Sequence, residues 1–180
     1  MMYVLLATGF TGAWTLLFVW RWLRRKLGHL FAVAVFFSPK GGCTEAVVKE
    51  LQSARHEIQV LAYSFTSKPI AQALVDAKLR GVHVEIVLDH SNEKEEYTDL
   101  HFFLEQGLTP LVDPHHAIAH NKVMIIDRAT VITGSFNFTS AAQRRNAENL
   151  LVIHRRELAI AYAENFARRR AVSVKYVEAP

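Results

Sequence analysis

The chain alternates between two hydrophobic periods, one typical of strands and one typical of helices. Residues 82–88 place apolar side chains at every second position, which is the pattern of a half-buried strand. Residues 44–54 and 67–80 instead place them every three or four positions, as an amphipathic helix does. Further strands are predicted at 31–37, 58–65, 108–112 and 149–153, and further helices at 97–106, 140–145 and from residue 156. These alternating units predict an α/β fold, a mixed β-sheet sandwich flanked by helices.

Residues 3–20 carry no charged side chain, and a basic cluster follows them at once. At about 1.5 Å per residue, a helix of this length nearly matches the ~30 Å hydrocarbon core of a bilayer. The basic cluster consists of Arg21, Arg24, Arg25 and Lys26. Because basic residues favour the cytoplasmic side, we expect a single-pass anchor in residues 1–26 and a cytoplasmic domain in residues 27–180. The alternatives are a buried helix and a cleaved signal peptide, which would leave the domain periplasmic or secreted.

The composition fits one globular domain with a short additional segment. Of the 180 residues, 51% are apolar and 21% are charged, which does not suggest disorder or a fibrous chain. The net charge of +4 leans modestly toward an anionic partner such as nucleic acid or an acidic lipid surface. Cys43 is the only cysteine, so the chain can form no internal disulfide and no cysteine-based zinc site.

Four hydrogen-bonding side chains stand beside apolar strand residues in the second half of the chain. Because side chains alternate between the faces of a strand, His120 and Lys122 should project to one side. Ser135 and Asn137 should do the same across a hairpin, so the four groups could converge. Asp127 stands at an odd spacing from the first pair, and we expect it to be a structural ion-pair or turn residue.

A histidine, a lysine, a serine, an asparagine and a carboxylate are the groups that metal-free attack on a phosphodiester requires. Lysine and asparagine can hold phosphate oxygens, while histidine can attack phosphorus. A carboxylate such as Glu148 could accept a hydrogen bond from the other ring nitrogen, which would fix the tautomer and stabilise the charged ring.

The same residues form a motif, and the motif resembles that of a known family. The pattern H-x-K-x4-D-x6-G-S-x-N is satisfied by His120, Lys122, Asp127, Gly134, Ser135 and Asn137. It resembles the signature of the phospholipase D superfamily, over roughly residues 31–170. The stretches AYSFT at 62–66 and GSFNFT at 134–139 look most like the small, single-motif bacterial endonucleases of the Nuc type.

The resemblance implies a phospholipase D-like catalytic domain that needs no cofactor and no metal. It implies a covalent phosphohistidine, with a second motif's histidine protonating the leaving oxygen and then activating water. Since this chain has one motif, a homodimer with the active site on its two-fold axis is expected. By this resemblance His120 is nucleophile in one subunit and acid/base in the other, Lys122 and Asn137 bind phosphate, Ser135 supports it, and Glu148 is the acidic partner.

Two phosphodiester substrates are expected to fit this chemistry. A nuclease acting on DNA or RNA is the leading hypothesis, and the runner-up is a phospholipase D acting on phosphatidylcholine or cardiolipin. The membrane anchor favours the second substrate, since it resembles the mitochondrial cardiolipin-hydrolase and Zucchini branch. A catalytically silent, membrane-tethered scaffold that binds nucleic acid is a third hypothesis.

Other polar clusters have competing interpretations. His115, His116 and His154 could form a metal set with His120, although His120 is expected to lie in a strand rather than on a helix. The basic residues Arg144, Arg145, Arg155 and Arg156 could line a nucleic-acid groove or form a solvated face.

Overall fold

The predicted strands assemble into one mixed sheet. In the computed structural model, which describes residues 18–19, 33–93 and 100–177, eight strands lie in the order β1-β7-β6-β5-β2-β3-β4-β8. Strands β2, β3 and β4 are mutually parallel, and the other neighbours are antiparallel. The strands are β1 Val33–Ser38, β2 Glu57–Ala62, β3 His83–Asp89, β4 Leu111–Asp113, β5 Lys122–Ile126, β6 Thr130–Gly134, β7 Glu148–His154 and β8 Val174–Lys175.

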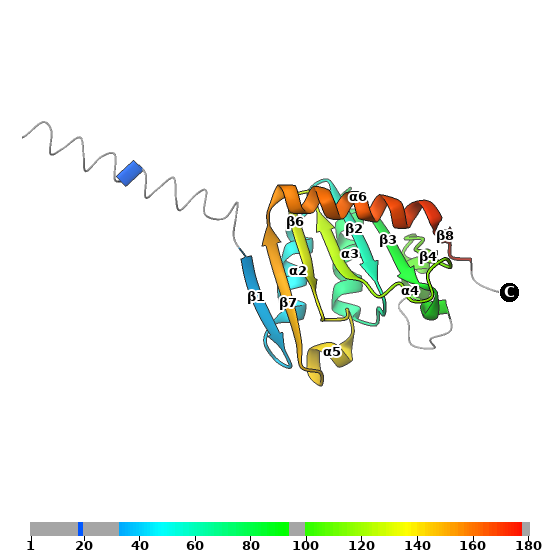
Figure 1. Cartoon of the computed structure of the whole chain (residues 1–180), viewed down its shortest axis with the longest axis horizontal. Helices are drawn as coiled ribbons and strands as arrows, with labels where there is room; N and C mark the ends of the chain where they lie inside the picture. The colour runs from blue at the N-terminus through cyan, green and yellow to red at the C-terminus, as the bar shows by residue number, and fades with distance from the viewer. Residues whose placement is uncertain (1–17, 20–32, 94–99, 178–180) are drawn as a thin grey trace, which may run out of the picture. The chain divides into compact units, whose positions relative to one another are not determined.

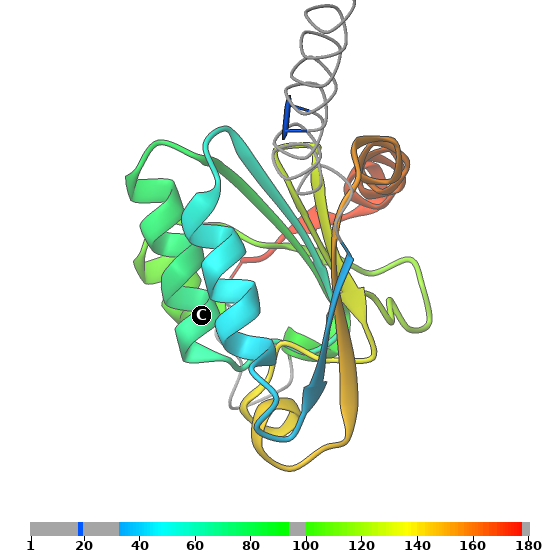
Figure 2. The ribbon, with the colours of Figure 1, turned by 90° about the vertical axis from the view of Figure 1, so that its left-hand side faces the viewer.

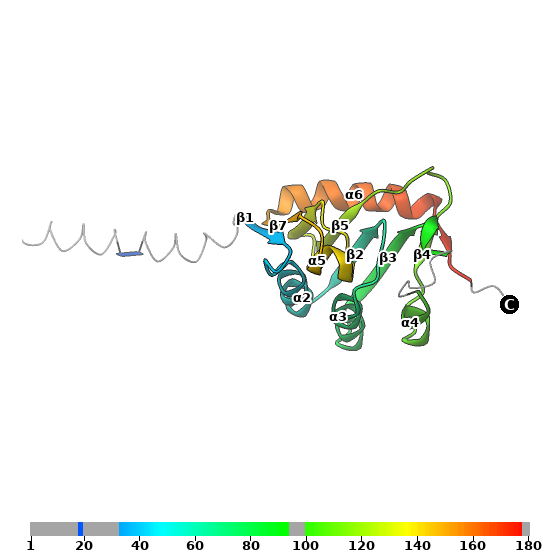
Figure 3. The same ribbon diagram turned by 90° about the horizontal axis from the view of Figure 1, so that it is seen from below.

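Helices cover both faces of this sheet. Helices α2, α3 and α4 lie on one face and α6 lies on the other, as Figures 2 and 3 show. The helices are α2 Cys43–Ser53, α3 Lys68–Leu79, α4 Leu100–Glu105, α5 Ser140–Arg144 and α6 Arg156–Val172, with a 3₁₀ turn at His90–Glu93. The predicted α/β fold with a mixed sheet and flanking helices is confirmed, with a single sheet between two helical layers.

The core is divided in two because successive residues of a strand point to opposite faces. Met124 of β5 belongs to the larger cluster, which is shared with α2 and α3. Its neighbours Val123 and Ile125 belong to the smaller cluster, which packs against Ala159 and Phe166 of α6. Strand β5 is therefore buried on both faces, as its uninterrupted apolar run predicts.

Several predicted boundaries are wrong, for local reasons. Helix α2 begins at Cys43 rather than at Thr44, because Gly42 occupies the cap position with φ 78°. Strand β2 ends at Ala62, and Phe65 forms only an isolated bridge with Phe138. Strand β4 begins after Pro110, whose missing N–H cannot join a ladder.

The predicted membrane anchor at 3–20 lies outside the described residues, apart from Phe18 and Val19. Among the residues that the structure describes, none belongs to a helix long and apolar enough to cross a membrane. The division of the chain at residue 26 and the cytoplasmic placement stay predictions.

Asp127 is a structural residue, as its spacing predicts. It follows β5 with φ 52°, and its carboxylate accepts hydrogen bonds from the backbone N–H groups of Arg55, His56 and Glu57 at 2.9, 2.8 and 3.0 Å. Burial would raise the pKa of Asp127, but these three donors outweigh it and hold the pKa below its usual value. The aspartate of the motif therefore fastens the β5–β6 turn to the start of β2.

Asp127→Asn should lower the free energy of unfolding by about 1–2 kcal/mol at pH 7. Asparagine tolerates the left-handed backbone, but its NH2 group would face one of the three backbone N–H donors and could not accept from it. A carboxyl with a depressed folded pKa stabilises above its unfolded pKa of about 3.9, and that contribution is lost as the pH falls through the folded pKa. Urea unfolding at pH 7 and pH 3 should show the difference shrinking at low pH. Exposed Glu164→Gln is the matched control. Equal losses for both variants would contradict the assignment.

Candidate active site

The candidate residues gather at one edge of the sheet. Strands β2, β3 and β6 end at this edge, whereas the antiparallel strands β5 and β7 begin there. Lys122 opens β5 opposite Ala62, and Glu148 opens β7 opposite Ser38. Lys122 shares the sheet face of Met124 and Glu148 shares that of Leu150, and both of these residues belong to the larger core cluster. The topology thus brings together residues that are far apart in the sequence.

His120 lies just before β5 and is exposed, so the expectation that it belongs to the strand is wrong. Its ring packs edge-on against Tyr63, with ring centroids 4.6 Å apart. Lys122 Nζ lies 5.0 Å from the centroid of the same Tyr63 ring. Tyr63 therefore holds the histidine and the lysine on one aromatic surface.

The motif alone did not assign a role to Tyr63. Its backbone N–H donates to the Asn121 carbonyl at 2.8 Å, and its own carbonyl accepts from Asn92 Nδ2 at 2.6 Å. The AYSFT stretch at 62–66, which looks like that of the Nuc-type endonucleases, contains Tyr63 and was the available signal for its role.

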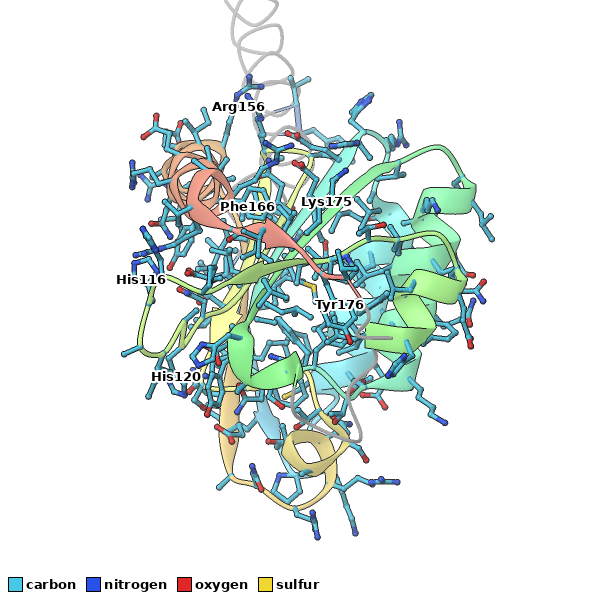
Figure 4. The ribbon with its side chains drawn as sticks, turned by 90° about the vertical axis from the view of Figure 1, so that its right-hand side faces the viewer. His116, His120, Arg156, Phe166, Lys175 and Tyr176 are labelled. Carbon is cyan, nitrogen blue, oxygen red and sulfur yellow. The ribbon has the colours of Figure 1, made fainter. Side chains whose placement is uncertain are left out.

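Two buried aspartates hold the loop that leads to His120, and sequence reasoning missed both. Asp89 Oδ2 accepts the backbone N–H of Ala119 at 2.6 Å, one residue before His120. Asp113 Oδ1 accepts the N–H of His115 at 2.9 Å, and its Oδ2 lies 2.8 Å from His116 Nδ1. Figure 4 shows His116 and His120 on the same side of the molecule. Burial would raise the pKa of each aspartate, but hydrogen bonds from Ser91 and Ala119 to Asp89, and from His115 and His116 to Asp113, outweigh it and hold both pKa values low.

Lys122 places a buried ammonium group in the site. Its side chain is 8% exposed, and Nζ has no hydrogen-bond partner among the described residues. Burial lowers the pKa of Lys122, while the Glu148 carboxylate acts in the opposite direction. An ammonium group that is buried without hydrogen bonds is costly, so this position is suited to an anionic ligand.

Ser135 and Asn137 sit on an irregular extension of β6. Ser135 is exposed, and its Oγ accepts the backbone N–H of Asn149 at 3.1 Å. Asn137 Oδ1 is buried and, within the described residues, has no hydrogen-bond partner. Gly134 permits this arrangement, because a Cβ there would lie 2.2 Å from the Asn149 carbonyl oxygen. No hydrogen bond within the described residues engages the Asn137 side chain, so its Nδ2 is available to donate to a ligand oxygen.

Glu148 is held by its own neighbours. Its Oε1 accepts from Asn146 Nδ2 at 3.2 Å, and its backbone N–H donates to Ser38 Oγ at 3.2 Å. In the described part of the chain, no hydrogen bond joins Glu148 to His120, so the predicted hydrogen bond between them is absent from this structure. Glu148 contributes to the site through its charge beside Lys122.

The four histidines considered as a metal set do not come together. His154 ends β7 at the opposite edge of the sheet, where Nδ1 lies 2.9 Å from Thr130 Oγ1. His116 faces Asp113 and Arg169 rather than His120. In residues 33–93 and 100–177, no group of three or more His, Cys, Asp or Glu side chains is arranged to hold a metal ion.

The four arginines also separate. Arg144 and Arg145 lie at the site edge, in and just after α5, whereas Arg155 and Arg156 follow the far end of β7. A seven-residue strand is about 20 Å long, so the two pairs lie at opposite edges of the sheet rather than in one cluster.

Known proteins share this fold and are similar to this chain in sequence. The family described as "Cardiolipin synthase, PLD-like domain" matches residues 47–170. A protein named "Phospholipase D" from Rickettsia bellii is 45% identical over 139 residues, covering 77% of this chain and 69% of that protein. The human "Mitochondrial cardiolipin hydrolase" is 25% identical, covering 83% of this chain and 71% of the human protein.

Among solved structures, the phospholipase D family member Nuc from Salmonella typhimurium matches with a TM-score of 0.77 and 38% identity. That match covers 81% of this chain and 97% of Nuc. The match of more than half of this chain to the family, together with the arrangement of its site residues, confirms the predicted resemblance. The chain therefore belongs to the phospholipase D superfamily, is similar to its Nuc-type members, and is a phosphodiester hydrolase.

Proposed function

We propose that the protein is a metal-independent nuclease that cleaves DNA or RNA through a covalent phosphohistidine at His120. The observation that carries this proposal is the exposed His120 beside a buried Lys122 whose Nζ has no hydrogen-bond partner among the described residues. His120 can attack phosphorus, and Lys122 can neutralise the phosphate oxygens. Both side chains contact the Tyr63 ring and therefore lie close to each other.

The reaction proceeds in two displacements. The neutral imidazole of His120 attacks phosphorus, while the protonated His120 of the partner subunit gives its proton to the leaving oxygen. That second histidine then takes a proton from water, which attacks the phosphohistidine and releases the first imidazole. Lys122 and Asn137 hold the non-bridging oxygens, Ser135 supports this phosphate-binding segment, and Glu148 supplies negative charge beside Lys122.

A homodimer completes the site, because each chain supplies one catalytic histidine. An exposed apolar stripe on β1 supports an interface next to the site: Val33, Val35 and Phe37 are 57%, 50% and 63% exposed. These residues share the sheet face opposite to that of Ser38 and Glu148, on the strand that ends at the site edge. The stripe is an apolar surface that a second copy can cover.

Phospholipid is the second candidate substrate, favoured by the name "Phospholipase D" of the relatives that are 45% identical. A phospholipid presents the same tetrahedral phosphodiester to the same side chains. An anchor in residues 3–20 would hold the site at a membrane surface, and the catalytic domain in the cytoplasm.

A side-by-side assay separates the two substrates. The full-length chain in detergent is incubated with excess chelator and either a labelled oligonucleotide or liposomes of phosphatidylcholine and cardiolipin. We expect cleavage of the oligonucleotide and no release of phosphatidic acid. Release of phosphatidic acid without nucleic-acid cleavage would establish the second candidate, and nucleic-acid cleavage that stops with chelator would refute the metal-independent route.

A further inference from the structure

We propose that Lys40, Arg144 and Arg145 form a basic rim that binds backbone phosphates of the nucleic acid beside the scissile bond. This inference rests on the proposed nuclease function and assigns part of its substrate site. Lys40 lies in the turn between β1 and α2, Arg144 ends α5, and Arg145 follows it. All three side chains are exposed.

The rim is built from two segments that lie side by side. The backbone N–H of Lys40 donates to the carbonyl of Gln143 at 3.3 Å. Gln143 also receives the backbone N–H of Thr44 on its Oε1 at 3.1 Å. Helix α5 in turn is capped by Thr139 Oγ1, which accepts the N–H of Ala142 at 3.1 Å. The three cations are thus carried by backbone that is fastened together rather than by independent loops.

The same backbone is fastened to the catalytic edge. Ser38 Oγ donates to the carbonyl of Asn146 at 2.9 Å and accepts the N–H of Glu148 at 3.2 Å. Helix α5 lies between Asn137 and Glu148 in the sequence, and Figure 1 shows it at the edge of the sheet where β7 begins. A polymer whose phosphate is held by Asn137 would extend past this helix.

The rim carries a surplus of positive charge. Within the described residues, none of its three cations forms an ion pair, although Arg144 donates to the Ser140 hydroxyl. The nearby acidic residues are already engaged: Glu45 Oε2 accepts from Gln143 Nε2 at 3.2 Å, and Glu148 Oε1 accepts from Asn146 Nδ2 at 3.2 Å. Unpaired, exposed cations next to a phosphodiester site attract a polyanion and release its counterions when they bind.

The surroundings favour nucleic acid over a bilayer. The segment 139–147, which carries Arg144 and Arg145, contains only small and polar or charged residues. The exposed Phe37 precedes Lys40 by three residues, but it belongs to the β1 stripe that the proposed dimer covers. A surface that enters the headgroup region of a membrane combines basic residues with bulky apolar ones, whereas phosphate contacts along a nucleic acid need only the cations.

The chain offers a matched control at the far end of β7. Arg155 and Arg156 are also adjacent and exposed, and they lie about 20 Å from the rim by the length of the strand. Arg144→Ala/Arg145→Ala and Arg155→Ala/Arg156→Ala therefore remove the same charge from opposite edges. Each variant of the full-length protein is assayed on a 20-nucleotide DNA, on bis(4-nitrophenyl) phosphate and on cardiolipin liposomes, over a range of salt concentrations.

For the rim variant we expect kcat/KM on DNA to fall about 10- to 100-fold at low salt. That loss should exceed the loss on the small diester by at least about tenfold, and the slope of log kcat/KM against log salt should decrease by about one to two. The Arg155/Arg156 variant should change DNA cleavage less than about threefold. Equal losses of kcat/KM in the two variants, or equal losses of kcat/KM on DNA and on the small diester, would contradict the proposed rim.

Two further outcomes separate the rim from the nuclease proposal itself. If the wild-type protein cleaves no nucleic acid, the nuclease proposal fails and the rim fails with it. If the wild-type protein cleaves DNA but the rim variant loses activity only on liposomes, the nuclease stands and the rim binds a lipid surface instead.

Discussion

Replacing His120 with alanine should lower kcat/KM for phosphodiester cleavage by about 10⁴-fold and leave the fold intact. The large effect is expected because the variant dimer lacks both the nucleophile and the acid/base group. The fold should survive because His120 is exposed, precedes β5, and makes its ring contact with Tyr63 at the surface of the site. Oligonucleotide cleavage and thermal unfolding, measured on the same preparation, check both parts.

His115→Ala is the matched control, since His115 is an exposed histidine on the same loop. It should retain most of the activity. Rapid acid quenching of the wild-type protein with substrate should trap a phosphohistidine that His120→Ala cannot form. A His120→Ala protein with more than a tenth of wild-type activity would contradict the assignment. Intact nucleic-acid binding with no trapped intermediate in the wild type would favour the silent scaffold.

Lys122→Met should lower the activity of the protein and raise its stability. Loss of the ammonium should lower kcat/KM about 10²- to 10³-fold, because a preorganised charge on the phosphate is removed. The free energy of unfolding should rise by about 1 kcal/mol, because methionine fills similar space without a buried ammonium that lacks hydrogen bonds. A gain of this size in a domain of this length raises Tm by roughly 2–4 °C.

The stability gain should depend on pH in a defined direction. Burial lowers the pKa of Lys122, so its charged form is disfavoured in the folded protein. That cost is fully present below the folded pKa and disappears as the pH rises toward the unfolded pKa of about 10.4. The gain should therefore be larger at pH 7 than at pH 10. Exposed Lys49→Met is the control, and a Lys122→Met protein that is less stable at pH 7 would contradict this account of the site.

The sequence predicted the features that depend on local periodicity. The strand predicted at 82–88 and the helix predicted at 67–80 both correspond to observed elements, β3 and α3. Burial of one face accounts for the period of α3, whereas β3 is buried on both faces from Ile86 onward. The side-chain parity that removed Asp127 from the chemistry also agrees with the structure, where its carboxylate binds backbone N–H groups. These inferences needed no knowledge of which strands are neighbours.

The missed features depend on contacts between distant parts of the chain. Asp89 and Asp113 each end a strand and turn back to hold the His120 loop, a role that becomes visible only with the sheet order. His120 lies outside β5, although its spacing from Lys122 suggested a strand position. The reason is that Asp89 and Asp113 bind backbone N–H groups of the loop that carries it. Strand β8 pairs with β4 through two residues, too few to give a periodic signal.

In the proposed mechanism each subunit holds half of one active site. Dimers that combine wild-type and His120→Ala chains show directly whether the site is shared. Wild-type and His120→Ala chains are coexpressed in varied ratios, and the activity of the purified dimers is measured at constant total protein. A shared site predicts that activity follows the square of the wild-type fraction, about a quarter at equal mixing, since a mixed dimer has only one His120. Activity proportional to the wild-type fraction, about one half at equal mixing, would contradict the shared site.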